Sequence, residues 1–303
     1  MLLAGLMILT ASCHSFSEPS VKLLRHKTLT DFPSASAIEY HNGRLYVLGD
    51  DAAHLLILDT AYHSLDTIRF LPDTAYRITK DTKPDIESSA LIEHNMQTYL
   101  YALGSFSGKA RTAVFHFPLD SPKNFLRIES GQLVQKLAEL PEINIEGMSF
   151  INGHYLLANR ANHTHRTNHL VLIDDFRESS SSAIIIPLLL DSSTVKGLSG
   201  IFYLPKKDLL LFTASEEATA NAMEDGVIAD SYLGWIQNFS KKLEQKTITP
   251  DRLVNLSALD AVFKQQKMES VCVEEAGPQK MILHLVADND NGQSSLFKIS
   301  LAL

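Results

Sequence analysis

Three glutamates, Glu87, Glu146 and Glu269, each stand directly before a small residue and an apolar segment. Serines occupy the comparable points at Ser34 and Ser199. A residue type that recurs at the start of similar segments is expected to meet its counterparts where the segments repeat around an axis. Carboxylates brought together in this way take up protons, pair with cationic side chains or hold a metal ion.

A second polar position follows the next apolar segment of each repeat. The clusters there are Gly49-Asp50-Asp51, Gly104-Ser105, Asn159-Arg160, Ser215-Glu216-Glu217 and Asp288-Asn289-Asp290. Long loops between segments are often functional, and the loop that contains Asp225 is one of these. We therefore expect a ligand site formed by Glu87, Glu146, Glu269, Arg111, Arg160, Ser105, Asn162, Glu216 and Asp225. We expect a metal, with Ca²⁺ as the candidate, at Asp50, Asp51, Asp288 and Asp290.

Three kinds of chemistry fit these residue types. In a structural role, Arg111 and Arg160 bridge the carboxylates and tie neighbouring repeats together. In a metal site, hard carboxylate oxygens hold Ca²⁺. In a catalytic site, a metal-bound water attacks a phosphate or acyl ester while the arginines neutralise the developing charge. The segment from Asp288 to Gly292 has the composition of a calcium loop, but its glycine comes one position early for an EF-hand.

The elements that must position these residues are short β-strands. Apolar runs of five to eight residues, rich in Val, Ile, Leu, Phe and Tyr, are separated by turn signals such as Asn42-Gly43 and Asn152-Gly153. The repeated phrase begins at positions 34, 87, 146, 199 and 269, at intervals of 53, 59, 53 and 70 residues. Four strands can be assigned to each of the first four repeats. Only three can be assigned to the last.

The missing strand has a candidate at the other end of the chain. An additional strand, Val21–Leu29, precedes the first repeat. A β-propeller closes in this way, with an N-terminal strand completing the last blade, and closure pairs strand edges that would otherwise be exposed. We therefore predict an all-β propeller with five four-stranded blades, six being the alternative. In a propeller, the start of the first strand and the end of the second lie at the same end of the axial channel, so the polar positions should surround one mouth.

The N-terminus predicts export. Leu2 to Leu9 form an apolar stretch too short to span a bilayer, and Thr10-Ala11-Ser12-Cys13 follow it. A cysteine after small residues is typical of a bacterial lipoprotein signal, with Cys13 carrying the lipid; a plain export signal is the alternative. We expect a signal peptide at 1–12, a tether at 13–20 and one propeller domain at 21–303. The protein would then be held at a membrane of the bacterial cell envelope.

Composition narrows the class of partner. The chain has 303 residues, a formal charge of −8 and 45% hydrophobic residues. These values are ordinary for a globular protein and argue against nucleic-acid binding, which usually requires a basic face. We expect a monomer.

The quoted motifs resemble a known family. The segments Pro33-Ser34-Ala35-Ser36, Asn144-Ile145-Glu146-Gly147, Thr213-Ala214-Ser215-Glu216 and Ala287-Asp288-Asn289-Asp290 look like those of an uncharacterised family of bacterial β-propeller lipoproteins. That family is similar to propellers described as esterase-like phytase or quorum-regulator-associated proteins. The chain departs from the pattern at Ala161, where Gly is expected, and at Glu217-Ala218, where Asp-Thr is more usual. The resemblance implies architecture and export but no settled activity.

We expect a binding protein for a small polar ligand or metal ion at an acidic channel mouth. Two alternatives remain open at this point. One is a calcium-dependent hydrolase of phosphate or carboxylic esters, and the other is a scaffold for protein contacts.

Overall fold

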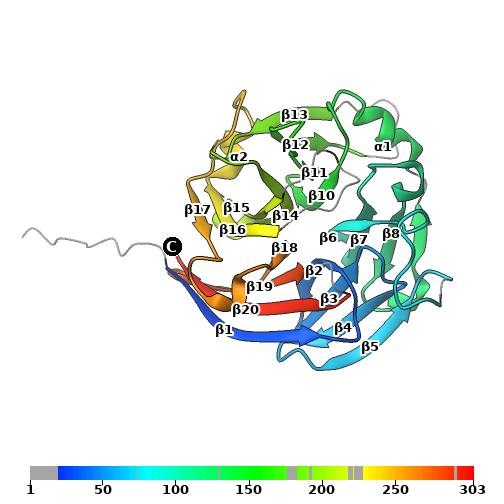
Figure 1. Cartoon of the computed structure of the whole chain (residues 1–303). Coiled ribbons are helices and arrows are strands. Elements are labelled where there is room, and N and C mark those ends of the chain that lie inside the picture. Colours follow the sequence, from blue (N-terminus) through cyan, green and yellow to red (C-terminus); the bar gives the residue numbers. More distant parts are fainter. Residues whose placement is uncertain are drawn as a thin grey trace, which may run out of the picture.

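The computed structural model describes residues 20–72, 74–128, 130–175, 183–190, 193–217, 221, 228–289 and 292–303. They form five four-stranded antiparallel sheets set around a central axis (Figure 1). The predicted all-β propeller is confirmed, with five blades rather than six. In each blade the strands follow one another in chain order from the axis outward, except in the last, where the N-terminal strand is outermost.

The strands have the following bounds. Blade 1 contains β2 (Ala35–His41), β3 (Arg44–Gly49), β4 (His54–Asp59) and β5 (Ser64–Arg69). Blade 2 contains β6 (Ile86–His94), β7 (Gln97–Gly104), β8 (Val114–Pro118) and β9 (Leu126–Ile128). Blade 3 contains β10 (Ile145–Ile151), β11 (His154–Asn159), β12 (Asn168–Ile173) and β13 (Ala183–Leu188). Blade 4 contains β14 (Lys196–Leu204), β15 (Leu209–Glu217), β16 (Ile228–Gln237) and β17 (Arg252–Asn255). Blade 5 contains β18 (Lys267–Ala276), β19 (Lys280–Asp288), β20 (Ser294–Ala302) and β1 (Ser20–Leu29).

Helical structure in the described residues is short. The α-helices are α1 (Gly131–Lys136) and α2 (Phe239–Lys242), and the 3₁₀ turns are η1 (Lys109–Arg111), η2 (Pro122–Asn124), η3 (Pro205–Lys207) and η4 (Ala261–Phe263). The segment between residues 252 and 264 contains strand β17 and the turn η4 rather than an α-helix. No helix of the described chain is long and apolar enough to cross a membrane.

The ring closes as predicted. Strand β1 pairs antiparallel with β20 from Ser20 opposite Ala302 to Leu29 opposite Ser294. The outer edge of β20 is therefore covered by chain from the other end of the sequence, which holds the first and last parts of the propeller in one sheet.

The hydrophobic core consists of five clusters, each lying between two adjacent blades. One face of every sheet packs in the cluster shared with the preceding blade, and the other face packs in the cluster shared with the following blade. Between blades 1 and 2, for example, Leu48 and Ile57 pack with Leu100 and Phe117. The strand sequences contain continuous apolar runs rather than a strict alternation of apolar and polar residues, as expected for strands that are buried on both faces.

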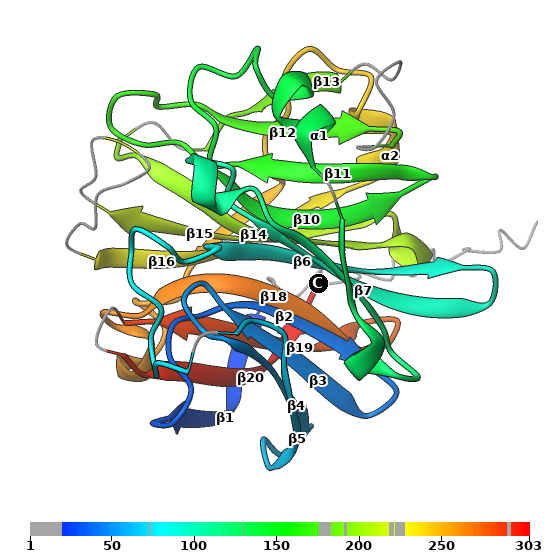
Figure 2. The ribbon, with the colours of Figure 1, turned by 90° about the vertical axis from the view of Figure 1, so that its right-hand side faces the viewer.

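The strand pairings define two faces of the disc. Lys267 pairs with Asp288, and Asp288 with Ser294, so the innermost strand of blade 5 begins on the same face where its second strand ends. We call this the mouth face. Lys280 pairs with Ala302, and Ala302 with Ser20, on the opposite face, which we call the base face. In the side view of Figure 2 the mouth face lies to the left and the base face to the right.

Candidate functional site

A β-bulge recurs at the mouth end of every innermost strand. In each blade the pairing of strands one and two skips one residue of the inner strand, and the skipped residues are Ser36, Glu87, Glu146, Ser199 and Glu269. A bulge leaves its extra residue out of the ladder and redirects the side chain. The repeated backbone irregularity thus presents five equivalent side chains at the channel, three of them glutamates.

This register corrects the alignment of the first repeat. The sequence pattern places Ser34 at the position of Glu87, whereas strand pairing places Ser36 there. Ala35 and Ser36 are both small, so sequence similarity alone could not distinguish the two registers.

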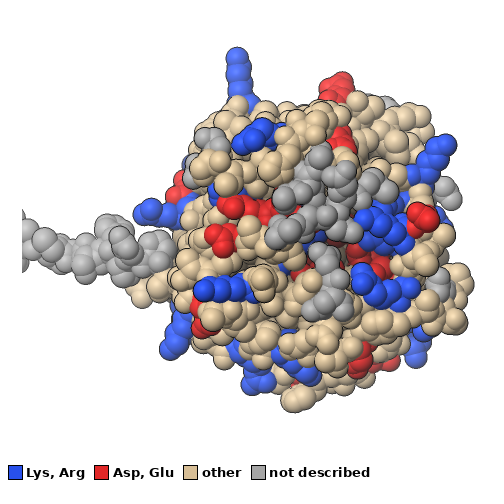
Figure 3. Space-filling view, viewed as in Figure 1, with Lys and Arg blue, Asp and Glu red and all other residues tan. Residues whose placement is uncertain are grey.

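The three bulge glutamates meet at the axis. Glu87, Glu146 and Glu269 each offer a carboxylate oxygen, and the three oxygens lie within 4.8 Å of one another. Glu146 and Glu269 are buried and Glu87 is partly exposed. We call these residues the axial triad. Figure 3 looks onto the mouth face and shows acidic surface on both sides of its centre.

The two bulge serines connect blades. The hydroxyl of Ser36 donates to the carbonyl of Ile86, and that of Ser199 donates to the carbonyl of Met268. Both acceptors belong to the next blade and directly precede a triad glutamate along the chain. Serine in these two blades therefore fixes the position of the neighbouring bulge.

Cationic side chains flank the triad on one side. Arg160 lies 3.4 Å from Glu146 and 2.9 Å from Glu217, while Lys267 lies 3.0 Å from Glu269 and 3.6 Å from Glu217. Burial opposes the charge of both cations, but the adjacent carboxylates, Glu146 first for Arg160 and Glu269 first for Lys267, raise the pKa of each. Both remain protonated, so Glu217 is bracketed by two positive charges.

The triad has more carboxyl groups than adjacent cations, and this crowding opposes their full ionisation. Burial raises the pKa of Glu87 well above its ordinary value, and the nearby carboxylate of Glu146 adds to the effect. Burial also raises the pKa of Glu269 to about 8, although Lys267 opposes the rise. One oxygen of Glu269, Oε2, is buried without a hydrogen-bond partner among the described residues. A cation bound at the axis would give this buried oxygen the electrostatic partner that it lacks.

A second acidic cluster adjoins the triad and shares Glu87. Asp50, Asp85 and Glu87 offer oxygens within 4.8 Å of one another. Lys83 pairs with Asp50 and, at 2.8 Å, with Asp85, which also accepts from Arg111 at 2.8 Å. Burial raises the pKa of Asp50 to about 7, against the opposing effect of Lys83. Here an ammonium group of the chain already pairs with two of the three carboxylates.

The other predicted residues lie around these clusters. Ser105 donates to Asp85 over 2.5 Å, and Asp51 pairs with Arg77 at 2.6 Å. Glu216 pairs with Lys196 at 3.2 Å, away from the triad. Asn162 accepts from the backbone of Thr164 and His165 and so shapes its own turn. Asp288 is buried close enough to Asp50 to raise its pKa. Asp225, Asp290 and Cys13 lie outside the described residues.

Four charged residues of the site were not predicted from sequence. Lys83 and Asp85 precede Glu87, Lys267 precedes Glu269, and Glu217 ends β15. In the short motifs Lys83-Pro84-Asp85-Ile86-Glu87 and Lys267-Met268-Glu269, a lysine stands two or four residues before a triad glutamate. This spacing could have predicted that Lys83 and Lys267 lie close to the site. Glu217 stood in a recognised polar cluster, but nothing local distinguished it from Glu216.

The arrangement suits cation binding better than acid–base chemistry. The carboxylates of the two clusters and their surroundings are Asp50, Asp85, Glu87, Glu146, Glu217 and Glu269, and the cations among them are Lys83, Arg111, Arg160 and Lys267. Carboxylates are in excess, and the excess falls on the triad. Carboxylate oxygens at this spacing are within reach of one hard cation, since Ca²⁺ takes oxygen ligands at about 2.3–2.6 Å.

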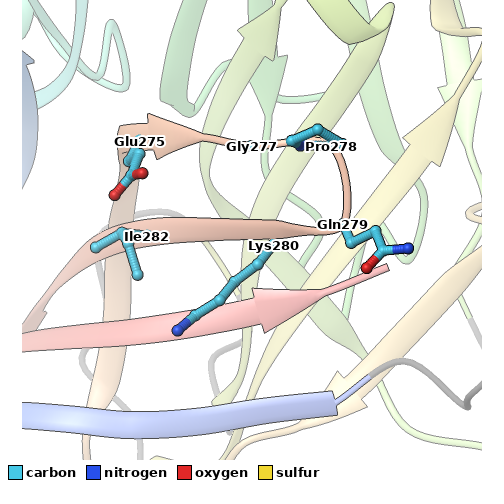
Figure 4. A pocket seen from close by; sticks show the side chains of 6 residues that line it. All are labelled: Glu275, Gly277, Pro278, Gln279, Lys280 and Ile282. Atoms are coloured by element: carbon cyan, nitrogen blue, oxygen red, sulfur yellow. The ribbon is translucent and has the colours of Figure 1, made fainter.

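A hollow of about 480 Å³ lies elsewhere, at the turn between β18 and β19. Its lining consists of Glu275, Gly277, Pro278, Gln279, Lys280 and Ile282 (Figure 4). Lys280 lies on the base face, so this hollow and the axial triad are at opposite ends of the disc.

Fold and site together define a five-bladed β-propeller with a cluster of acidic side chains at its axis. The family model described as a family of unknown function, DUF6929, matches residues 31–301, and the chain belongs to this family. No curated protein matches it.

Solved structures support the fold alone. The glutaminyl cyclase of Myxococcus xanthus is similar with a TM-score of 0.53 at 11% identity, over 93% of this chain and 96% of that one. The xyloglucan-locus protein GH43B of Bacteroides ovatus is similar with a TM-score of 0.50 at 11% identity, over 90% of this chain and 54% of that one.

Proposed function

We propose that this protein binds a divalent metal ion at the axial triad, with Ca²⁺ as the first candidate. The observation that carries the proposal is the convergence of Glu87, Glu146 and Glu269 from equivalent bulges, together with the buried, unpartnered Oε2 of Glu269. Three carboxylates from three blades form a rigid set of hard oxygen ligands, because each is fixed by a strand rather than a loop.

A thermal melt of the chain from Ser20 onward tests this proposal. A ligand that binds only the folded state at 100 times its dissociation constant stabilises that state by about 2.7 kcal/mol, which for a domain of this size raises Tm by roughly 5 °C. We expect such a rise with CaCl₂ and its reversal by a chelator. The rise should disappear in Glu269→Gln and persist in Glu216→Gln, a carboxylate variant on the same face but outside the triad. Equal melts with Ca²⁺, Mg²⁺, Mn²⁺ and chelator would refute metal binding.

Hydrolysis of phosphate or carboxylic esters, in the manner of phytase-like propellers, is less well supported. That chemistry needs an arginine available to a substrate anion. Arg160 is paired with Glu146 and Glu217. Arg111 pairs with Asp85 through Nη1, and its Nη2 has no hydrogen-bond partner among the described residues but is buried. The burial of both guanidinium groups and their pairs favour ion binding or a structural role over turnover. No contact described above favours the scaffold alternative.

We further propose that Cys13 carries a lipid that holds the mature protein at a membrane of the cell envelope. The support is the apolar segment Leu2 to Leu9 followed by small residues and Cys13. Mass spectrometry of the N-terminal peptide from a bacterial host tests it, with Cys13→Ser as control. An unmodified Cys13 in the membrane fraction would contradict the anchor.

A further inference from the structure

The described chain begins on the base face, opposite the axial triad. Ser20 pairs with Ala302, and Ala302 with Lys280, at the end of blade 5 that is farthest from Lys267 and Asp288. Cys13 precedes Ser20 by about seven residues, which even when extended span at most about 25 Å. If Cys13 holds the chain in a bilayer, that bilayer lies close to the base face, and the channel mouth is directed away from it.

One hairpin on the base face carries an unusual residue. The turn between the two inner strands is Asn42-Gly43 in blade 1 and Asn152-Gly153 in blade 3, with positive φ at both positions. In blade 2 the same turn is Asn95-Met96, and Met96 has a φ of +62°. This backbone conformation favours glycine, because the Cβ of any other L-residue is crowded there.

Met96 is also almost completely exposed. Its exposed fraction is 97%, and the β6–β7 hairpin that carries it projects from the right-hand side of Figure 2. The residue makes no packing contribution that would offset its unfavourable backbone conformation. A large apolar side chain at the tip of a projecting hairpin is suited to contact with an apolar environment outside the protein.

Further exposed apolar side chains lie toward the base end of two outermost strands. Leu65 is the second residue of the outer strand of blade 1, and Ile184 is the second residue of that of blade 3. Their exposed fractions are 52% and 57%. Since the outermost strand runs from the base face to the mouth face, both lie toward the base rim, in the blades on either side of blade 2. Leu126 of blade 2 is also exposed, but it pairs with His116, which pairs with Tyr101 midway along β7, so it lies between the two faces.

We propose that the base face of blades 1 to 3 docks on a lipid bilayer, with Met96 inserted among the acyl chains and Leu65 and Ile184 at the headgroup boundary. This inference rests on the proposed lipid anchor at Cys13, whose tether leaves from the same face. The axial triad then opens toward solvent.

Oxidative footprinting on vesicles tests the proposal. The chain from Cys13 onward is coupled through that thiol to maleimide-bearing lipid in phosphatidylethanolamine–phosphatidylglycerol vesicles; Cys272 is buried and does not compete. Hydroxyl radicals then oxidise exposed side chains, and exposed methionine reacts readily. We expect oxidation of Met96, Leu65 and Ile184 to fall several-fold on vesicles relative to the uncoupled chain. Tyr76 and Leu259, exposed apolar residues away from the base face, serve as controls whose oxidation should not change.

A matched variant separates docking from stability. Met96→Gly restores the Asn-Gly turn of the neighbouring blades, so it should not lower Tm, yet it should weaken flotation of the Cys13→Ser chain with the same vesicles at least threefold. Leu259→Ala should leave flotation unchanged. Undiminished oxidation of Met96 on vesicles would overturn the docking and direct the search toward a protein partner for this face. Because the coupling supplies an anchor chemically, that result would be independent of the lipid on Cys13 and of the metal test above.

Discussion

Lys267 contacts one oxygen of Glu269 over 3.0 Å, and the other oxygen of the same carboxylate is buried without a hydrogen-bond partner among the described residues. Lys267 therefore pairs with only one of the two carboxylate oxygens of Glu269. Asp50 and Asp51 also have one buried oxygen without a hydrogen-bond partner among the described residues, beside their pairs with Lys83 and Arg77. What sets Glu269 apart is its place in the triad, where Glu87 and Glu146 each present a carboxylate oxygen within 4.8 Å.

Replacing Glu269 should affect metal affinity far more than stability. Its pKa is raised to about 8, so at pH 7 the metal-free protein holds this carboxyl mostly protonated, and Glu269→Gln resembles that form. We expect the free energy of unfolding without metal to change by less than about 1 kcal/mol, while metal affinity falls roughly 100-fold. Calorimetric titration and urea unfolding measure the two effects. Loss of folding in Glu269→Gln would show instead that the ionised carboxylate is structural.

Metal binding should be coupled to proton release. A metal ion requires the ionised carboxylate, and the pKa of Glu269 is raised to about 8 while that of Glu87 is raised as well. Affinity should therefore increase as pH rises from 6 to 8, by up to about tenfold per pH unit for each proton displaced. Titrations in two buffers of different ionisation enthalpy give the number of protons released. A value of zero at pH 7 would contradict the proposed ligands.

Without metal, the same groups should make the protein less stable at higher pH. A carboxyl whose pKa is higher in the folded state stabilises that state below its unfolded pKa of about 4.5, and this contribution is lost as pH rises through about 8. The metal-free protein should melt at a lower temperature at pH 8.5 than at pH 6, and Glu269→Gln should reduce this difference. Addition of the metal should restore the melting temperature at pH 8.5.

The junction between blades 5 and 1 should respond to pH in the opposite direction. His284 is fully buried, accepts from Tyr62 at 2.8 Å and lies 2.7 Å from Glu274. Burial lowers the pKa of His284 to about 4, so its stabilising contribution is present above about 6.5 and is lost as pH falls toward 4. His284→Gln should flatten the loss of stability between pH 6.5 and 4, measured by urea unfolding. An unchanged slope would indicate that other groups control acid unfolding.

Removing Lys83 should destabilise the protein strongly. Its ammonium group pairs with both Asp50 and Asp85, and all three side chains are largely buried. Lys83→Met leaves two carboxylates without their cation, and breaking a buried pair in this way typically costs about 3–5 kcal/mol. The exposed Lys109→Met is the matched control and should change the free energy of unfolding by less than about 0.5 kcal/mol. If Lys83→Met binds added Ca²⁺ while the wild type does not, the metal site lies at Asp50 and Asp85 rather than at the triad.

The amino-acid sequence by itself determined the propeller, its five blades and its closure by the N-terminal strand. These features depend on local signals, namely apolar runs of strand length and turns such as Asn42-Gly43, which repeat at nearly regular intervals. The convergence of Glu87, Glu146 and Glu269 could also be predicted, because equivalent positions of a ring must face the same axis.

Only the tertiary structure decided which cationic side chain pairs with which carboxylate. Lys83 lies against Asp50 from the preceding blade, and Arg160 of blade 3 pairs with Glu217 of blade 4. Such pairs depend on side-chain length, burial and the register of bulges in different sheets. None of these produces a periodic pattern in the amino-acid sequence. The first-repeat register at Ser36 was missed for a related reason: a bulge shifts strand pairing by one residue without changing the apolar pattern around it.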